Sequence, residues 1–99
     1  MKMYRQGDVL ILEIPASAAI RGKVTADRIL VYGEATGHAH RIDSDVPVIM
    51  DSPQGKTISS VVPFRLVHDE HDTIEIPEGT YRVIRQREYD ETEIRYVTD

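Results

Sequence analysis

The sequence predicts a single all-β domain, a small barrel or sandwich of about seven short strands. Its length of 99 residues is typical of one domain with one hydrophobic core. Apolar residues occur in short runs separated by Gly, Pro, Asp and Ser, which is the pattern of strands joined by turns. The sequence contains no alternation of strands with long helical segments, so a parallel α/β sheet is not expected. Residues 1–99 are therefore taken as one β domain.

The first predicted strand covers Val9–Ile14, an aliphatic run between a Gly-Asp pair and Pro15. This run is too short to be a helix before the proline stops it. At most one short helix, of one or two turns, is predicted near residues 15–21, because Pro15 suits the first helical position and Gly22 suits the end.

The later strands are predicted from apolar runs and the turns between them. Residues 28–32 form one strand, and residues 46–50 and 57–62 form a hairpin around a polar turn that contains Pro53 and Gly55. The remaining predicted strands cover residues 64–68, 73–76, 80–86 and 93–97.

The composition excludes several classes of chemistry. The chain has no cysteine, so a disulfide scaffold, a thiolate nucleophile and a cysteine metal site are excluded. Twelve Lys and Arg against 17 Asp and Glu give a net charge of −5. A chain of this charge repels a phosphate backbone, so nucleic acid is not expected as a partner.

The chain is expected to be cytoplasmic. It has no run of about 20 apolar residues of the kind that spans a membrane, and its first residues lack the order of regions found in signal peptides. A small core and unpaired sheet edges are features of chains that form homo-oligomers or bind a protein partner, so either is expected here.

The first of two histidine pairs lies in Gly37-His38-Ala39-His40. Residues two apart on a strand point to the same side, so His38 and His40 can present their imidazoles together. Two imidazoles on one face are a starting pair for a transition metal. Glu34 is a candidate carboxylate neighbour.

The second pair lies in residues 68–72, His-Asp-Glu-His-Asp. If Asp69 and Glu70 form the tip of a two-residue hairpin, His68 and His71 face each other.

An alternative register with a three-residue loop pairs His68 with Asp72, Leu66 with Ile74 and Phe64 with Ile76. This register matches apolar residues across the strands better, and we favour it. It leaves His71 at the loop tip, where it becomes a ligand only if the loop folds back.

These residues predict a histidine-rich metal site. We expect His38, His40 and His68 to be ligands, with His71 or Glu70 completing the set. Imidazole and carboxylate ligands suit zinc, nickel, iron or manganese, and the sequence does not distinguish among these divalent metals. The alternative is that the histidines are surface residues or members of a polar network.

A second hypothesis comes from a different functional class. The domain would be a protein-binding adaptor or structural module without metal, and Tyr81, Tyr89 and Tyr96 would contact its partner.

Residues 33–40 and Pro77-Glu78-Gly79 resemble the two motifs of cupins, which hold a metal in a small β-barrel. The sequence departs from that pattern because no glutamate follows His40 at the expected distance. Arg82 also occupies the place of the last cupin histidine. The resemblance implies a β-barrel more than an active site.

The chain is also similar, over nearly its full length, to a set of small uncharacterised prokaryotic and phage-type proteins. The matching segments are Tyr4-Arg5-Gln6-Gly7-Asp8-Val9, Gly33-Glu34-Ala35-Thr36-Gly37-His38-Ala39-His40-Arg41, His68-Asp69-Glu70-His71, Ile76-Pro77-Glu78-Gly79-Thr80-Tyr81-Arg82-Val83 and Arg85-Gln86-Arg87-Glu88-Tyr89. This resemblance implies that the segments belong to one domain, and it implies no reaction.

Overall fold

The computed structural model describes residues 2–19, 21–32 and 38–85. Within these residues it contains ten strands and one short 3₁₀ turn. The strands are β1 (Met3–Gln6), β2 (Val9–Ile14), β3 (Lys23–Thr25), β4 (Ile29–Tyr32), β5 (Ala39–Ile42), β6 (Val48–Ser52), β7 (Gly55–Ser60), β8 (Phe64–Val67), β9 (Ile74–Ile76) and β10 (Gly79–Arg85). No helix among the described residues is long and apolar enough to cross a membrane.

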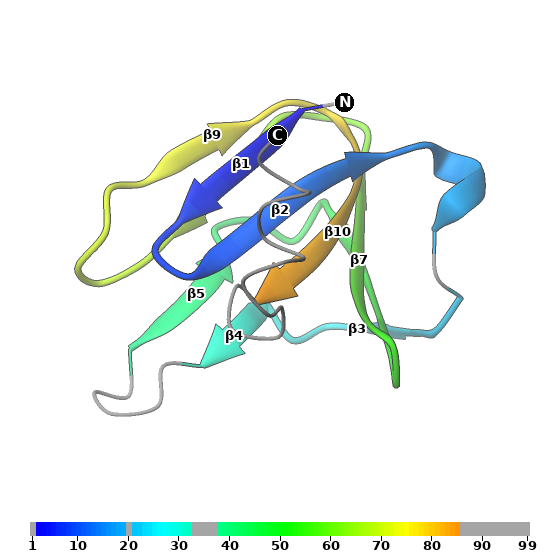
Figure 1. The fold of residues 1–99 in the computed structure, drawn as a ribbon, viewed down its shortest axis with the longest axis horizontal. Coiled ribbons are helices and arrows are strands. Elements are labelled where there is room, and N and C mark those ends of the chain that lie inside the picture. The colour runs from blue at the N-terminus through cyan, green and yellow to red at the C-terminus, as the bar shows by residue number, and fades with distance from the viewer. Residues whose placement is uncertain (1, 20, 33–37, 86–99) are drawn as a thin grey trace, which may run out of the picture.

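The strands form two antiparallel sheets (Figure 1). One sheet has six strands in the order β1-β2-β10-β7-β6-β3, and the other has four in the order β4-β5-β8-β9. The prediction of an all-β fold is confirmed, and the arrangement resembles a sandwich rather than a closed barrel. The core contains Val9, Ile11, Leu30, Ile42, Ile49, Ile58, Phe64, Leu66, Ile76 and Tyr81.

Most of the predicted strands are present within about two residues of their expected ends. β2 has the predicted bounds, and β6 and β7 pair as a hairpin in which Ser52 faces Gly55 across a two-residue turn. The predicted strand over residues 93–97 lies outside the described residues.

The predicted helix is reduced to a single 3₁₀ turn, Ala16–Ala18. The backbone is extended at both Pro15 and Ala19, so the turn has no room to continue. No side chain caps its first residue, and the turn buries none of its residues. The segment therefore lacks the buried face that usually stabilises a helix.

Three described strands, β1, β3 and β5, were not predicted as separate strands. β1 and β3 are short edge strands of the six-stranded sheet. They carry few buried apolar side chains, so they lack the apolar run on which the prediction relied. β5 contains His40, which the sequence analysis placed on an extended segment without assigning bounds.

The β8–β9 ladder confirms the favoured register. Phe64 faces Ile76 and Leu66 faces Ile74, as predicted from the match of apolar residues. The loop between these strands carries the second histidine pair.

Tyr81 is part of the core. Its ring packs edge to face against Tyr4 and Phe64, and its hydroxyl donates a hydrogen bond to the Pro77 carbonyl at 2.7 Å. Burial of the phenol raises its pKa. The prediction that Tyr81 contacts a partner at the surface is therefore wrong, whereas Tyr89 and Tyr96 lie outside the described residues.

Candidate metal site

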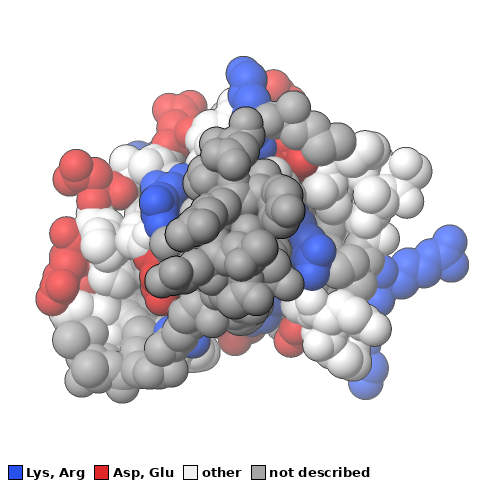
Figure 2. All heavy atoms as spheres, in the orientation of Figure 1, with Lys and Arg blue, Asp and Glu red and all other residues white. Residues whose placement is uncertain are grey.

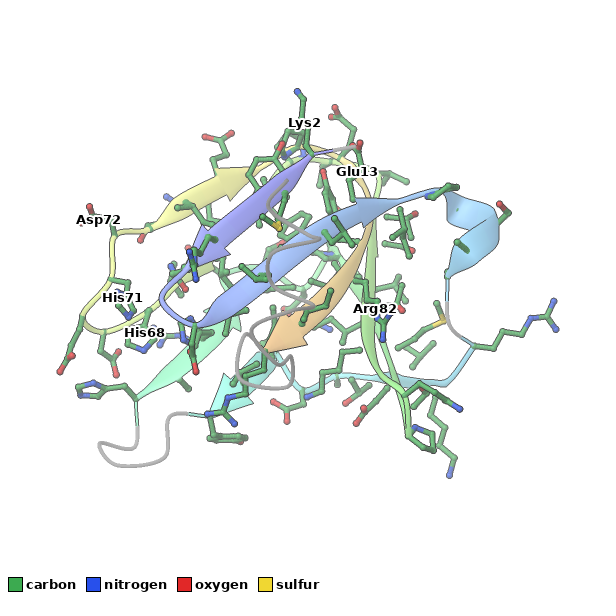
Figure 3. The ribbon with its side chains drawn as sticks, in the orientation of Figure 1. Lys2, Glu13, His68, His71, Asp72 and Arg82 are labelled. Atoms are coloured by element: carbon green, nitrogen blue, oxygen red, sulfur yellow. The ribbon has the colours of Figure 1, made fainter. Side chains whose placement is uncertain are left out.

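The two histidine pairs come together in space. The ring centroids of His40 and His68 lie 4.3 Å apart, and those of His68 and His71 lie 4.6 Å apart. The His38 ring lies 5.8 Å from that of His68, and the His71 ring lies 5.9 Å from that of His40. We call His38, His40, His68 and His71 the histidine cluster; Figure 3 labels His68 and His71 in the turn after β8.

The pairing of β5 with β8 explains this convergence. Arg41 faces Val67 and Ile42 faces Leu66 in the four-stranded sheet. His40 comes directly before Arg41, and His68 comes directly after Val67. The two imidazoles are therefore neighbours at the same end of adjacent strands.

Gln6, at the end of β1, connects the two histidine segments. Its side chain is buried, and its amide Nε2–H groups donate to the Leu66 carbonyl at 3.0 Å and the Asp72 carbonyl at 2.9 Å. Its Oε1 lies 2.8 Å from Nδ1 of His40. One buried amide thus holds β5 and the turn after β8 against the end of β1.

This network assigns the tautomer of His40. Both Gln6 donors go to carbonyl oxygens, so its Oε1 must accept and Nδ1 of His40 must donate. Burial of the imidazole, followed by the charge of His68, lowers the pKa of His40 to about 4. His40 is therefore neutral near pH 7, with a lone pair on Nε2, which is the form that binds metal.

Asp8 lies against that lone pair. Its Oδ1 is 3.6 Å from Nε2 of His40, and its Oδ2 is 3.4 Å from Nε of Arg85. Asp8 is the second residue of a two-residue turn that follows Gln6, and Gly7 before it has φ +59°. A glycine with this φ at the first central position is typical of a type II′ hairpin turn.

The ring of His68 has the opposite tautomer to that of His40. Its Nδ1 accepts hydrogen bonds from the backbone N–H groups of Glu70 at 3.0 Å and His71 at 3.3 Å. In the neutral ring the hydrogen is therefore on Nε2, which has no lone pair for a metal in this arrangement. In agreement, no three His, Cys, Asp or Glu side chains of the described residues are positioned together to hold a metal ion.

The other candidate residues surround this centre. Nδ1 of His38 lies 3.1 Å from Oε1 of Glu70, and Arg41 pairs with Asp69 at 3.6 Å. His71 lies over the backbone of Gly7, since a Cβ on that glycine would be 2.6 Å from Nε2 of His71. Glu34 lies outside the described residues.

Acidic side chains gather on the side of the molecule that carries the turn after β8. Figure 2 shows acidic side chains along the left margin of the molecule. Figure 3, in the same orientation, labels Asp72 on that side. Asp69, Glu70 and Asp72 come from this turn, and Asp8 adds a carboxylate from the β1–β2 turn. This distribution favours a cation over an anion near the histidine cluster.

The sequence analysis did not identify Gln6 or Asp8 as site residues. One pattern in the sequence could have indicated Asp8. The Gly-Asp pair before Val9–Ile14 forms a two-residue turn if Met3–Gln6 is taken as a strand. That turn would have placed Asp8 at the end of the sheet. Nothing in the sequence places it beside His40, which is 32 residues further along the chain.

Comparison with known proteins gives one match. A family profile described as Domain of unknown function (DUF8820) matches residues 5–86, which include all four histidines, Gln6 and Asp8. Comparison with the curated proteins and with the solved structures finds no match. The match covers most of the chain, and the chain therefore belongs to the DUF8820 family.

Proposed function

We propose that this domain binds one divalent transition-metal ion at the histidine cluster. The observation that carries the proposal is His40, a buried neutral imidazole with its lone pair on Nε2, whose ring lies next to those of His68 and His71. The candidate ligands are those expected from the sequence: His38, His40, His68, His71 and Glu70. Zinc, nickel, iron and manganese all suit such ligands.

The orientation of the Gln6 amide supports this role for His40. Histidines that bind metal generally donate their second ring N–H to a fixed acceptor, which orients the ring and sets the tautomer. Oε1 of Gln6 is such an acceptor at 2.8 Å. With this arrangement, Nε2 of His40 can bind a metal ion without any change in β1 or β5.

Metal binding requires a local change at His68. A metal would take a lone pair of His68 only after Nδ1 releases the backbone N–H groups of Glu70 and His71, so that Nδ1 itself binds the ion or the ring hydrogen moves to Nδ1 and leaves a lone pair on Nε2. Two such hydrogen bonds contribute about 1–3 kcal/mol together. That is far below the roughly 10–16 kcal/mol of structural zinc sites, so the loop between β8 and β9 can rearrange around the ion.

The ion would supply Lewis acidity to the domain. If three side chains of the histidine cluster held it, a position would stay open for water or a substrate, as metal hydrolases and lyases require. His40 holds its lone pair toward that ion, and the acidic turn lowers the free energy of a bound cation.

Metal content tests the proposal. The protein is purified without a histidine tag, loaded separately with zinc, nickel, iron and manganese, and analysed by mass spectrometry for metal per chain. We expect close to one ion per chain for at least one metal, and a sharp loss in His40→Ala. The exposed Asp45→Asn variant is the control and should retain the metal.

Circular dichroism of each variant separates loss of the ligand from loss of the fold. His40→Gln, which keeps a polar side chain at this buried position, replaces His40→Ala if the alanine variant does not fold. Absence of bound metal in the wild-type protein after all four loadings would overturn the proposal and favour the adaptor hypothesis.

A further inference from the structure

We propose that Asp8 is the carboxylate ligand of this metal site and that Gln6 is the residue that positions His40 toward it. The inference rests on the proposed metal-binding function and adds two residues to the predicted ligand set. It replaces Glu70 as the carboxylate that approaches the ion.

The distance between Asp8 and His40 suits two ligands of one ion. Oδ1 and Nε2 are 3.6 Å apart, which is too long for a hydrogen bond. Neither atom carries a hydrogen when Asp8 is ionised and His40 donates through Nδ1, so two lone pairs face each other. Two ligands at about 2.0–2.2 Å from a tetrahedral ion are about 3.4 Å apart, so a cation fits between these atoms after a small closure.

Asp8 is also already held in an orientation that suits this role. Arg85 approaches its other oxygen, with Nε at 3.4 Å from Oδ2, and also donates from Nη2 to the Tyr32 carbonyl at 3.1 Å. Arg85 thereby leaves Oδ1 facing His40. Carboxylates that bind metals are commonly held by such contacts to the oxygen that does not face the ion.

Glu70, in contrast, is engaged with other residues. Its Oε1 lies 3.1 Å from Nδ1 of His38, and its side chain is 63% exposed. Its backbone N–H donates to Nδ1 of His68. Asp8 is the carboxylate that lies nearest Nε2 of His40, at 3.6 Å, whereas the side chain of Glu70 pairs with His38 and is largely exposed.

Gln6 acts through His40 and does not touch the ion. Its three hydrogen bonds determine which nitrogen of His40 carries the hydrogen, and they fasten the loop between β8 and β9 beside it. With a leucine at this position, nothing would select the tautomer that faces Asp8. The resulting set of imidazoles and one carboxylate selects a borderline divalent ion such as zinc or iron(II) over soft copper(I).

Isothermal titration with Zn²⁺ tests Asp8 as a ligand. We expect Asp8→Asn to weaken binding by at least about tenfold, Glu70→Gln to weaken it less than Asp8→Asn does, and the matched change Asp69→Asn to alter it less than about threefold. An Asp8→Asn protein that binds Zn²⁺ as tightly as the wild type would overturn the inference while leaving metal binding by the histidines in place. A wild-type protein that binds no Zn²⁺, nickel, iron or manganese would overturn both.

Nuclear magnetic resonance of the metal-free protein tests Gln6 without any ion. Long-range proton–nitrogen correlations of the His40 ring report which nitrogen is protonated. We expect Nδ1–H in the wild type and a mixture of tautomers in Gln6→Leu, with weaker Zn²⁺ binding. The role of Gln6 is refuted if wild-type His40 carries its hydrogen on Nε2, or if Gln6→Leu changes neither the tautomer nor the affinity. If Gln6→Leu does not fold, Gln6→Met serves as the second variant.

Discussion

A single buried ring determines the chemistry of the candidate site. His40 is only 3% exposed, yet it lies beside two other imidazoles, those of His68 and His71, and a carboxylate. Burial and the two neighbouring histidines oppose its protonation, while Asp8 favours it, and burial is the largest effect. The ring is thus neutral where an exposed histidine would be partly charged.

This neutral ring makes stability depend on pH. The pKa of His40 is about 4 in the folded protein and 6.5 in the unfolded chain. Between these values the unfolded chain binds more protons, so the free energy of unfolding rises with pH across this window and falls on acidification. We expect His40 to contribute up to about 3 kcal/mol above pH 6.5, a contribution fully lost below pH 4.

Chemical denaturation of metal-free protein between pH 4 and 8 measures this dependence. His40→Asn is the control, because it removes the titrating group and retains a polar side chain. The difference between the two stability curves should change by about 3 kcal/mol over the window. Parallel curves would show that His40 titrates normally in the folded protein.

Gln6 gives a second expectation at the residue scale. Its replacement by leucine leaves the Leu66 and Asp72 carbonyls and Nδ1 of His40 without their present partners. Loss of partners for buried polar groups costs about 1–3 kcal/mol each where water cannot enter. We expect Gln6→Leu to lower the free energy of unfolding by about 2–4 kcal/mol, measured by urea denaturation. Gln54→Leu in the exposed turn between β6 and β7 should change it by less than about 0.5 kcal/mol.

Among the elements, the β1–β2 turn has the clearest link to the candidate site. It brings Asp8 to the cluster and lets His71 lie over Gly7. Gly7 has φ +59°, a conformation that other residues rarely adopt, and a Cβ there would lie 2.6 Å from Nε2 of His71. Backbone strain and a steric clash thus act at the same position.

We therefore expect Gly7→Ala to destabilise the protein by about 1–3 kcal/mol and to displace His71. Urea denaturation measures the first effect, and the ring resonances of His71 report the second. Gln54→Ala, in the turn between β6 and β7, is the matched control and should have little effect on either. A Gly7→Ala protein with wild-type stability and an unmoved His71 ring would contradict the importance of this close contact.

The elements also show where the sequence was informative. Val9–Ile14 and the β8–β9 register were predicted because their apolar residues repeat with clear boundaries. β1 has no such repeat, and its place in the sheet depends on pairing with β2. Of the short helix allowed near residues 15–21 only a 3₁₀ turn forms, because the local signals at Pro15 and Gly22 act on a segment that has no apolar face to bury.

At the scale of the whole molecule, the candidate site depends on contacts between distant segments. The sequence showed two histidine pairs, but their convergence follows from the pairing of β5 with β8. Gln6 reaches Leu66 and Asp72 across 60 and 66 positions of the chain. No local pattern encodes such contacts, which explains why the histidines were predicted and the residues that hold them were not.

Because these segments belong to separate parts of the chain, a metal bound among them should stabilise the entire fold. A ligand that binds only the folded state adds RT ln(1 + [L]/Kd), about 2.7 kcal/mol at a free concentration of 100 times Kd. For a domain of this size we expect the melting temperature to rise by roughly 10–20 °C. Differential scanning calorimetry with and without Zn²⁺ measures the shift, and a chelator should reverse it.

Three variants show which residues are responsible for the rise in melting temperature. His40→Ala should abolish it, Asp8→Asn should reduce it, and Asp45→Asn should retain it in full. A rise of the same size in His40→Ala would mean that Zn²⁺ binds elsewhere on this acidic surface. The expected pattern would instead mean that one ion joins the β1–β2 turn, β5 and the loop after β8, so that binding at the cluster and stability of the sandwich become a single equilibrium.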